Sequence, residues 1–347
     1  MNRTLRNAAD LAAAGLLSGP EADALHDVLS RYAVSVTPDM AELIDLDDPA
    51  DPIARQFVPQ GAETVVAPEE RADPIGDAAH APVVGIVHRY PDRVLLKPLH
   101  ICPVYCRFCF RREMVGPDGL GSLTEAELDG ALAYIAQDPR IWEVVLTGGD
   151  PFALSARRLG AIAERLSAIE HVRVMRIHTR VPVVKPDLVD ADLVEALKRF
   201  GRAVFVALHA NHPREFAPAA RAACARLVDA GIPMVSQSVL LRGINDDPAN
   251  LEALMRAFVE SRIKPYYLHH GDLAPGTGHL RTSLTEGQAL MRTLRGRLSG
   301  LAQPTYVLDI PGGHGKVPVG PGYLRDADGE TRVTDPNGYE HAYPPKA

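Results

Sequence analysis

The sequence predicts an α/β protein built on a parallel sheet, and two observations carry this prediction. Seven apolar, β-rich runs recur between residues 94 and 310, and from the second onward they begin roughly 30 residues apart, with a longer interval before the last. Helical patterns lie between them. Alternation of this kind is typical of repeated βα units, and six or seven units suit a complete or partial (β/α) barrel.

The predicted elements follow one another in a regular order. We expect strands at 94–102, 143–149, 172–179, 203–210, 233–241, 264–272 and 305–310. The clearest helical patterns span 124–138, 155–169, 248–262 and 285–299. Several of these helices begin with Ser, Thr or Pro followed by an acidic residue, as helix N-termini often do. Catalytic groups of a barrel are then expected at the C-terminal ends of the strands.

The two ends of the chain lack this rhythm, which predicts three parts. Residues 1–90 form an N-terminal helical and extended arm, because the stretch 44–83 is rich in Pro and Asp. Residues 91–285 form the barrel core. Residues 286–347 form a C-terminal segment, and its tail 322–347 predicts a hairpin with a Gly/Asn turn.

Composition excludes several classes of protein. Apolar residues make up 46% of the chain, so a large core can be buried. The net charge of −7, without a block of like charge, indicates neither a nucleic-acid nor a membrane partner. The first apolar run is too short for a signal sequence or a membrane span, so we expect a cytoplasmic protein.

Three of the four cysteines lie together in "HICPVYCRFCFRREMVG", residues 100–116. A structural zinc site usually has four ligands, and His100 is the only nearby candidate to join Cys102, Cys106 and Cys109. Three thiolates after the first barrel strand instead favour a cubane [4Fe–4S] cluster with one open iron. Cys224, on a helical pattern, is expected to be a buried inert thiol.

The C-x₃-C-x₂-C spacing, with an aromatic residue before the third cysteine, resembles the radical S-adenosylmethionine (SAM) superfamily. That resemblance implies that the open iron binds SAM and that one electron cleaves it to a 5′-deoxyadenosyl radical. An electron donor such as a flavodoxin or ferredoxin is then expected. The resemblance also implies that Gly148, Gly149 and Asp150, in "LTGGDPF", bind the SAM amino group. Alone, these three residues would indicate an ordinary turn.

A glycine run precedes Lys316 in "YVLDIPGGHGKVPVGPGYL", residues 306–324. It is consistent with a turn bearing an exposed lysine. It also gives a lysine room to meet a planar cofactor such as pyridoxal 5′-phosphate (PLP). The spacing is not that of a phosphate-binding P-loop.

Over about residues 40–340 the chain resembles the lysine 2,3-aminomutase family. The resemblance rests on motifs in family order: "DPADPIARQFVP", "HRYPDRVLL", "CRFCFRR", "LTGGDP", "HANHP", "SQSVLLRGIND", "YYLHHGD" and "DIPGGHGK". It implies a partial (β/α)6-type radical SAM barrel and a Lys316 that carries PLP. It also implies that Tyr90 and Arg93 hold the cofactor phosphate, although both are consistent with structural roles alone.

The same resemblance implies how a substrate is held. Arg111 matches the family's binder of the substrate carboxylate, for which a guanidinium is well suited. Asp272 and Asp309 match its two binders of a distal ammonium group. Either aspartate is also consistent with a turn or a helix N-cap. Two acids favour lysine over glutamate as the substrate.

The resulting prediction is an L-lysine 2,3-aminomutase, a homo-oligomer acting on a small amino acid. Phe108, where the long family members have histidine, keeps open a β-lysine-forming enzyme for elongation factor P. An aminomutase for another cationic amino acid is a further alternative. The sequence shows no additional C-terminal cysteines for the structural zinc of the long members, and His314 has no assigned role. A cluster-bearing, redox-responsive binding module without turnover is the alternative from another class.

Overall fold

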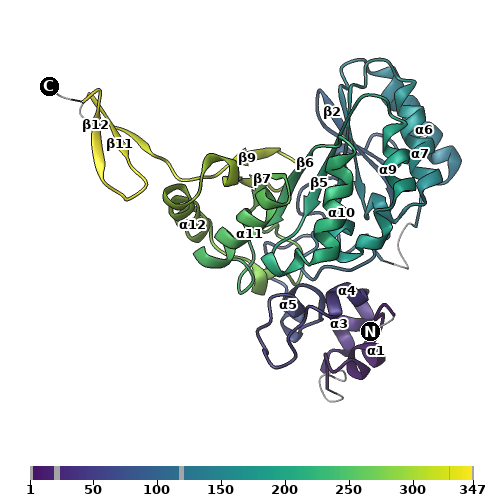
Figure 1. The fold of residues 1–347 in the computed structure, drawn as a ribbon, viewed down its shortest axis with the longest axis horizontal. Helices are drawn as coiled ribbons and strands as arrows, with labels where there is room; N and C mark the ends of the chain where they lie inside the picture. The colour runs from purple at the N-terminus through teal and green to yellow at the C-terminus, as the bar shows by residue number, and fades with distance from the viewer. Residues whose placement is uncertain (1–2, 19–23, 117–120, 328, 346–347) are drawn as a thin grey trace.

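The computed structural model describes residues 3–18, 24–116, 121–327 and 329–345, and its largest unit is a nine-stranded sheet (Figure 1). The strands follow one another across the sheet in chain order, from β1 to β9. Their bounds are β1 (Ile86–Tyr90), β2 (Arg93–Leu99), β3 (Glu143–Gly148), β4 (Val174–Thr179), β5 (Ala203–His209), β6 (Met234–Val239), β7 (Ile263–His269), β8 (Thr305–Asp309) and β9 (Lys316–Pro318).

Strands β2 to β8 are all parallel, and each of the seven predicted strands is confirmed. β1 pairs antiparallel with β2 at one edge of the sheet, and β9 pairs antiparallel with β8 at the other. Among the described residues these two edge strands do not pair with each other, so the barrel is open. The predicted α/β fold with a partial barrel is therefore confirmed.

Helices connect the parallel strands, as right-handed βα crossovers require. They are α6 (Glu125–Gln137), α7 (Ala156–Ser167), α8 (Val181–Val184), α9 (Ala191–Lys198), α10 (Pro218–Asp229), α11 (Pro248–Glu260) and α12 (Leu284–Arg297). α6 and α12 each begin with a capping box, Thr124 with Glu127 and Ser283 with Glu286. No helix in the described ranges is both long and apolar enough to cross a membrane.

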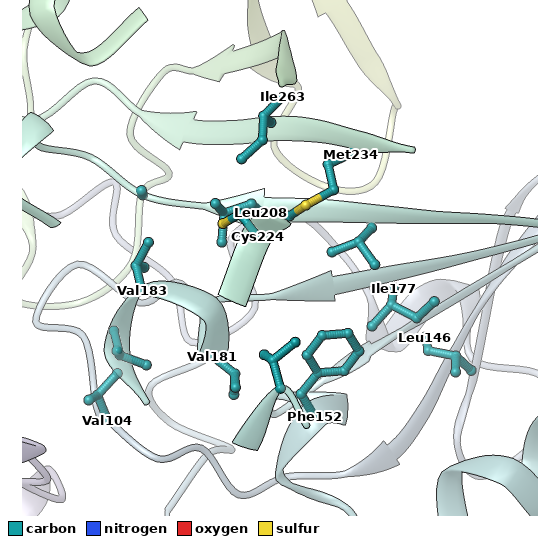
Figure 2. Close-up of a cluster of buried hydrophobic side chains, with 14 of the residues drawn as sticks. Val104, Leu146, Phe152, Ile177, Val181, Val183, Leu208, Cys224, Met234 and Ile263 are labelled. Atoms are coloured by element: carbon teal, nitrogen blue, oxygen red, sulfur yellow. The ribbon is translucent and has the colours of Figure 1, made fainter. Parts of the chain in front are cut away.

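The main core lies between the sheet and these helices. Consecutive strands contribute Leu146, Ile177, Leu208 and Met234 to one buried cluster, which Cys224 of α10 completes (Figure 2). The full burial of Cys224 confirms the prediction of a buried thiol. Because side chains alternate along a strand, the neighbouring residues face the opposite side of the sheet, where the cavity described below lies.

The N-terminal arm consists of short helices joined by extended chain. They are α1 (Ala8–Ala13), α3 (His26–Arg31), α4 (Pro38–Ala41) and α5 (Ala54–Phe57), followed by the 3-10 turns η1 (Gly61–Thr64) and η2 (Ala78–His80). The main sheet crosses both predicted boundaries, since β1 begins at Ile86 and both β8 and β9 follow residue 286. The division at residues 90 and 285 therefore stays a prediction.

The C-terminal tail corrects one prediction. It forms three antiparallel strands, β10 (Leu324–Ala327), β11 (Glu330–Thr334) and β12 (Glu340–Tyr343), rather than a single hairpin. The turn between β11 and β12 is held by the Asp335 side chain, which accepts the amides of Asn337 and Tyr339. This small sheet projects away from the barrel (Figure 1).

Candidate active site

A cavity of about 650 Å³ lies inside the open barrel, a size typical of small-molecule sites. Its walls contain eleven of the twelve predicted site residues. They are Tyr90, Arg93, Cys102, Cys106, Cys109, Arg111, Gly149, Asp150, Asp272, Asp309 and Lys316. Gly148 is the exception. The structure thus brings together residues that are spread over more than half of the chain.

The three thiols lie on the loop between β2 and α6, none in a disulfide. Cys106 Sγ accepts a hydrogen bond from Arg180 Nη1 at 3.0 Å. The Asp150 amide, close to Cys102, donates to Ile101 O at 3.0 Å. Burial raises the pKa of all three thiols, to about 11 for Cys109. Iron binding therefore has to displace protons from this loop.

No three His, Cys, Asp or Glu side chains of the described residues are arranged as ligands of a single metal ion. A cubane cluster makes a different demand, because each thiolate binds its own iron. Three free, half-buried thiols that open onto one cavity fit such a cluster.

A buried carboxylate of the N-terminal arm fixes the cysteine loop. Glu63 accepts hydrogen bonds from Arg107 and Arg112, with Arg107 Nε 3.0 Å from Glu63 Oε1. Burial alone would raise the pKa of Glu63, but these two guanidinium groups hold that pKa below its usual range. Both arginines lie within the "CRFCFRR" motif, so their ion pairs fix the backbone between and just beyond the cysteines.

The glycine pair lets the end of β3 lie directly against the same loop. The Gly149 amide donates to Leu99 O at 2.7 Å, and a Cβ on Gly149 would lie 2.3 Å from Ile101 O. At Gly148 a Cβ would lie 2.6 Å from Leu99 O. Close backbone packing therefore explains both glycines, and their contact with SAM stays a prediction.

Asp150 is held in one orientation by the end of β4. Its Oδ1 accepts the Thr179 hydroxyl at 2.7 Å and the Phe152 amide at 3.0 Å, and its Oδ2 accepts the Arg180 amide at 2.7 Å. Burial raises the pKa of this carboxyl group. The carboxylate is thus fixed beside Cys102, where its role toward the SAM amino group stays a prediction.

At the other side of the cavity, the glycine run folds the chain back as a hairpin between β8 and β9. Gly312, Gly313 and Gly315 have φ values of +85°, +85° and +98°, which side chains with a Cβ rarely adopt. The hairpin pairs Lys316 directly with Asp309. The backbone amide of Lys316 also donates to the Tyr90 hydroxyl at 2.7 Å.

The Lys316 amino group therefore projects into the cavity among defined neighbours. Its Nζ lies 2.7 Å from Asp309 Oδ2, 3.1 Å from His269 Nδ1 and 5.3 Å from the centre of the Tyr267 ring. Burial and the nearby Lys316 lower the pKa of His269 to about 4, so this imidazole is neutral. A lysine amine beside an aromatic ring, within a cavity, fits a covalent site for PLP.

The two predicted ammonium binders differ in their surroundings. Asp309 contacts Lys316 and His269, which hold its pKa below the usual range despite burial. Asp272 forms no hydrogen bond or ion pair within the part of the chain that the structure describes. Burial and the nearby Asp309 raise the pKa of Asp272 to about 7.

Arg111 is fixed by an acid that the sequence did not single out. Its Nε and Nη2 lie 3.1 Å and 2.8 Å from Asp77 Oδ2. Asp77 also accepts Arg89 Nη2 at 3.3 Å, and Arg89 Nη1 lies 3.8 Å from Asp309. Asp77 and Arg89 thus connect the predicted carboxylate binder to the predicted ammonium binder.

Arg93 lies at the wall of the cavity without contacting Lys316. It pairs with Asp92 at 2.7 Å, and its guanidinium lies 3.9 Å from the centre of the Tyr90 ring. Its role toward a cofactor phosphate, like that of Tyr90, stays a prediction.

Several cavity residues were missed from the sequence. They are Asp77, Arg89, His178, Arg180, His209 and His269. The Nε2 atoms of His178 and His209 have no hydrogen-bond partner in the described residues, and burial lowers the pKa of both imidazoles well below the usual value. Alternation along the predicted strands was the signal that could have found these histidines. Asp77, in the aperiodic arm, gave no such signal.

Fold and cysteine loop together define a class, the radical SAM enzymes. A model described as the Radical SAM superfamily matches residues 96–254, and one described as Lysine-2,3-aminomutase matches residues 291–337. The L-lysine 2,3-aminomutases of Fusobacterium nucleatum and Clostridium subterminale are 38% and 39% identical to this chain. These alignments cover 94% and 89% of this chain and 79% and 74% of those proteins. The chain therefore belongs to the lysine 2,3-aminomutase family.

A glutamate 2,3-aminomutase from Clostridioides difficile is also similar, at 34% identity over 89% of this chain and 72% of that protein. The protein is thus a radical SAM aminomutase, an isomerase that uses a [4Fe–4S] cluster, SAM and PLP. This assignment decides against a binding module without turnover, and the placement of the cluster on the three cysteines stays a prediction. The assignment leaves the substrate open.

Proposed function

We propose that this enzyme is an L-lysine 2,3-aminomutase, which moves the amino group of lysine from C2 to C3 to give β-lysine. The observation that carries the proposal is Asp272, an acid without an ion-pair partner among the described residues, on the cavity that also contains Lys316 and Arg111. A buried acid whose pKa is raised to about 7 is stabilised by an arriving cation. The distal ammonium of lysine is such a cation.

Each cofactor has a proposed set of residues. The cluster is held by Cys102, Cys106 and Cys109, SAM by Gly148, Gly149 and Asp150, and PLP by Lys316, Tyr90 and Arg93. When bound, the cluster and SAM supply a 5′-deoxyadenosyl radical, and PLP carries the migrating amino group. The residues that line the cavity orient the substrate between these groups.

Arg111 is proposed to bind the substrate carboxylate. Asp77 contacts its Nε and Nη2, so its Nη1 is not used by that ion pair. Because Asp77 fixes the guanidinium plane, little side-chain freedom is lost when a carboxylate binds. A carboxylate on Arg111 orients the α-carbon of the substrate within the cavity.

Asp272 and Asp309 are proposed to bind the distal ammonium. Lys316 would hold PLP through its amine, which would then no longer be free to pair with Asp309. Asp309 then keeps the neutral His269 and the more distant Arg89 as neighbours. A substrate ammonium restores the missing positive charge between the two acids.

Glutamate is disfavoured by the same arrangement. Its distal carboxylate would lie against Asp272 and Asp309. Like charges in contact within a low-dielectric site repel each other strongly. Arginine and ornithine carry the required charge but differ from lysine in reach. These differences give the proposal a direct test.

The test is a substrate panel with the reconstituted enzyme under anaerobic conditions, in the presence of SAM, PLP and dithionite. L-Lysine, L-ornithine, L-arginine and L-glutamate are incubated separately, and the β-amino acid products are separated by chromatography. We expect conversion of lysine, poor conversion of ornithine and none of glutamate. Unmodified elongation factor P is added as a fifth substrate. Conversion of glutamate as readily as lysine, or of the protein-linked lysine alone, would contradict the proposal.

A further inference from the structure

The three cysteine sulfurs have different surroundings. Cys106 accepts a hydrogen bond from a guanidinium, with Arg180 Nη1 3.0 Å from Cys106 Sγ. In the described residues this is the one contact between a cationic side chain and a cysteine sulfur of the loop. A charged donor is stronger than a neutral amide.

Arg180 cannot leave this position easily. Its Nη2 lies 2.7 Å from Glu215 Oε2 and 2.5 Å from Gln56 Oε1, and its guanidinium packs 4.6 Å from the Phe57 ring. Only 5% of the residue is exposed. These contacts hold the Arg180 guanidinium in place, with its Nη1 directed at the sulfur of Cys106.

Glu215 is equally well held. It is fully buried, and its Oε1 accepts the backbone amides of Asn211 and His212 at 2.8 Å and 2.9 Å. These amides remain when Arg180 is changed. The two amides can therefore hold the carboxylate in place without its guanidinium partner.

We propose that Arg180 and Glu215 form an opposed charge pair that sets the reduction potential of the cluster. This inference rests on the proposed placement of the cluster on Cys102, Cys106 and Cys109. A low-potential one-electron donor adds one electron to the cluster, so the reduced form carries one more negative charge. Hydrogen bonds and charge at the sulfurs shift this equilibrium.

The two members of the pair act in opposite directions. The Arg180 cation stabilises the reduced cluster and raises the potential, whereas the Glu215 anion lowers it. Loss of Arg180 therefore makes the cluster harder to reduce, and loss of the Glu215 charge makes it easier to reduce. If Arg180 and Glu215 had only a structural role, the two changes would not shift the reduction potential in opposite directions. Each would then only loosen the same region of the protein.

The experiment is an EPR-monitored redox titration of the reconstituted holoprotein with low-potential mediators. Arg180→Gln is expected to lower the ratio of reduced to oxidised cluster at least tenfold at a fixed solution potential, which is 59 mV for one electron. Glu215→Gln, which keeps an acceptor for the two amides, is expected to raise that ratio several-fold. The double variant should lie between the two.

Arg112→Gln is the matched control. Arg112 is another buried arginine and lies within the cysteine loop itself, but it contacts Glu63 and the Arg107 carbonyl rather than a sulfur. It should change the ratio less than threefold. Equal potentials in Arg180→Gln, Glu215→Gln and the parent, or a shift of the same sign in both variants, would overturn the inference.

Iron content separates this failure from failure of the proposed site. A parent protein that does not retain about four irons on the three cysteines contradicts the cluster placement itself. Should the variants lose the cluster, pulsed EPR of the parent decides, with arginine that carries ¹⁵N only in its guanidinium group. A ¹⁵N coupling to the reduced cluster supports the Arg180 hydrogen bond, and its absence overturns it.

Discussion

The two ends of the cavity differ in how their charges are satisfied. At the cluster end, which comprises the cysteine loop, Glu63, Asp150 and Glu215, every carboxylate already accepts several hydrogen bonds from the protein. At the lysine end, which comprises Asp272, Asp309 and Lys316, Asp272 has no partner in the described residues, and Asp309 shares the amine proposed to bind PLP. The first end is therefore prepared before ligands arrive, and the second is completed by them.

The largest expected effect is loss of the cluster from the prepared end. Cys106→Ala removes one of three thiolates, the minimum anchor of a cubane with an open iron. We expect no retained iron and no SAM cleavage, as measured by iron analysis and chromatography of 5′-deoxyadenosine, while PLP still binds. A variant that keeps about four irons and cleaves SAM would show that the cluster lies elsewhere.

Lys316→Ala is the reciprocal change at the lysine end. It should abolish aminomutase turnover and the PLP adduct that borohydride reduces, and leave iron content and the cluster spectrum unchanged. Peptide mapping of the reduced protein gives the position of the pyridoxyl group in the parent. Its presence on another lysine would refute the assignment.

Asp309→Asn tests whether the lysine end is completed by a substrate cation. Loss of one partner of a buried charge pair costs about 3–5 kcal/mol, or roughly two to four powers of ten in kcat/KM. Turnover of L-lysine should fall by that factor while the spectra of the cluster and of PLP stay normal. Unchanged kinetics would remove the argument for an ammonium site.

Glu63→Gln tests the rigidity of the cluster end through stability. It leaves Arg107 and Arg112 buried without their carboxylate, which costs about 3–5 kcal/mol of unfolding free energy. Urea unfolding of the protein without cofactors measures this loss. The control is Glu164→Gln, which removes an exposed ion pair with Arg199 and should change little.

The smallest expected effect has the opposite sign. The folded-state pKa of Asp272 is about 7, above its unfolded value, so folding is penalised increasingly as pH rises from about 4 to 7, and the penalty is constant above pH 7. Asp272→Asn should therefore stabilise the protein without cofactors at pH 8 by about 1–3 kcal/mol, and hardly at pH 4. Thermal unfolding at a series of pH values measures the trend.

Asp309→Asn provides the contrast in the same experiment. The pKa of Asp309 is held low by His269 and Lys316, so its stabilising contribution is present above the unfolded pKa and is lost as pH falls. This variant should be less stable than the parent at pH 7. Destabilisation by Asp272→Asn at pH 8 would mean that Asp272 already has a cationic partner.

The barrel could be predicted from the sequence because its strands recur at regular intervals between helical patterns. β3 is nearly a continuous apolar run, whereas β4 and β6 alternate between buried core residues and residues of the cavity side. The number of strands in the tail, β10 to β12, could not be predicted in the same way. Leu324, Tyr339 and Tyr343 are exposed in that small sheet, so no buried face imposes a pattern on it. Only its Asn337–Gly338 turn was visible from the sequence.

The candidate site also contains residues that the sequence pattern predicts and residues that it does not predict. The cysteines, Asp150, Asp272, Asp309 and Lys316 follow predicted strands or lie in recognisable motifs, so their meeting at one cavity could be expected. Their supporting partners come from the aperiodic arm. Glu63 and Asp77 reach their arginines across 44 and 34 positions of the chain, and no local pattern specifies such a contact.

In the hairpin between β8 and β9, the number of residues between Asp309 and Lys316 is as important as the identity of those residues. Asp309 and Lys316 are opposite each other in an antiparallel ribbon, so both side chains point to the same face. Insertion or deletion of one residue between Ile310 and Gly315 would turn the lysine to the outer face of the ribbon. A homologous chain could thus keep every motif residue and still lose the cofactor amine from its cavity, if the aspartate and the lysine were separated by one residue more or one fewer.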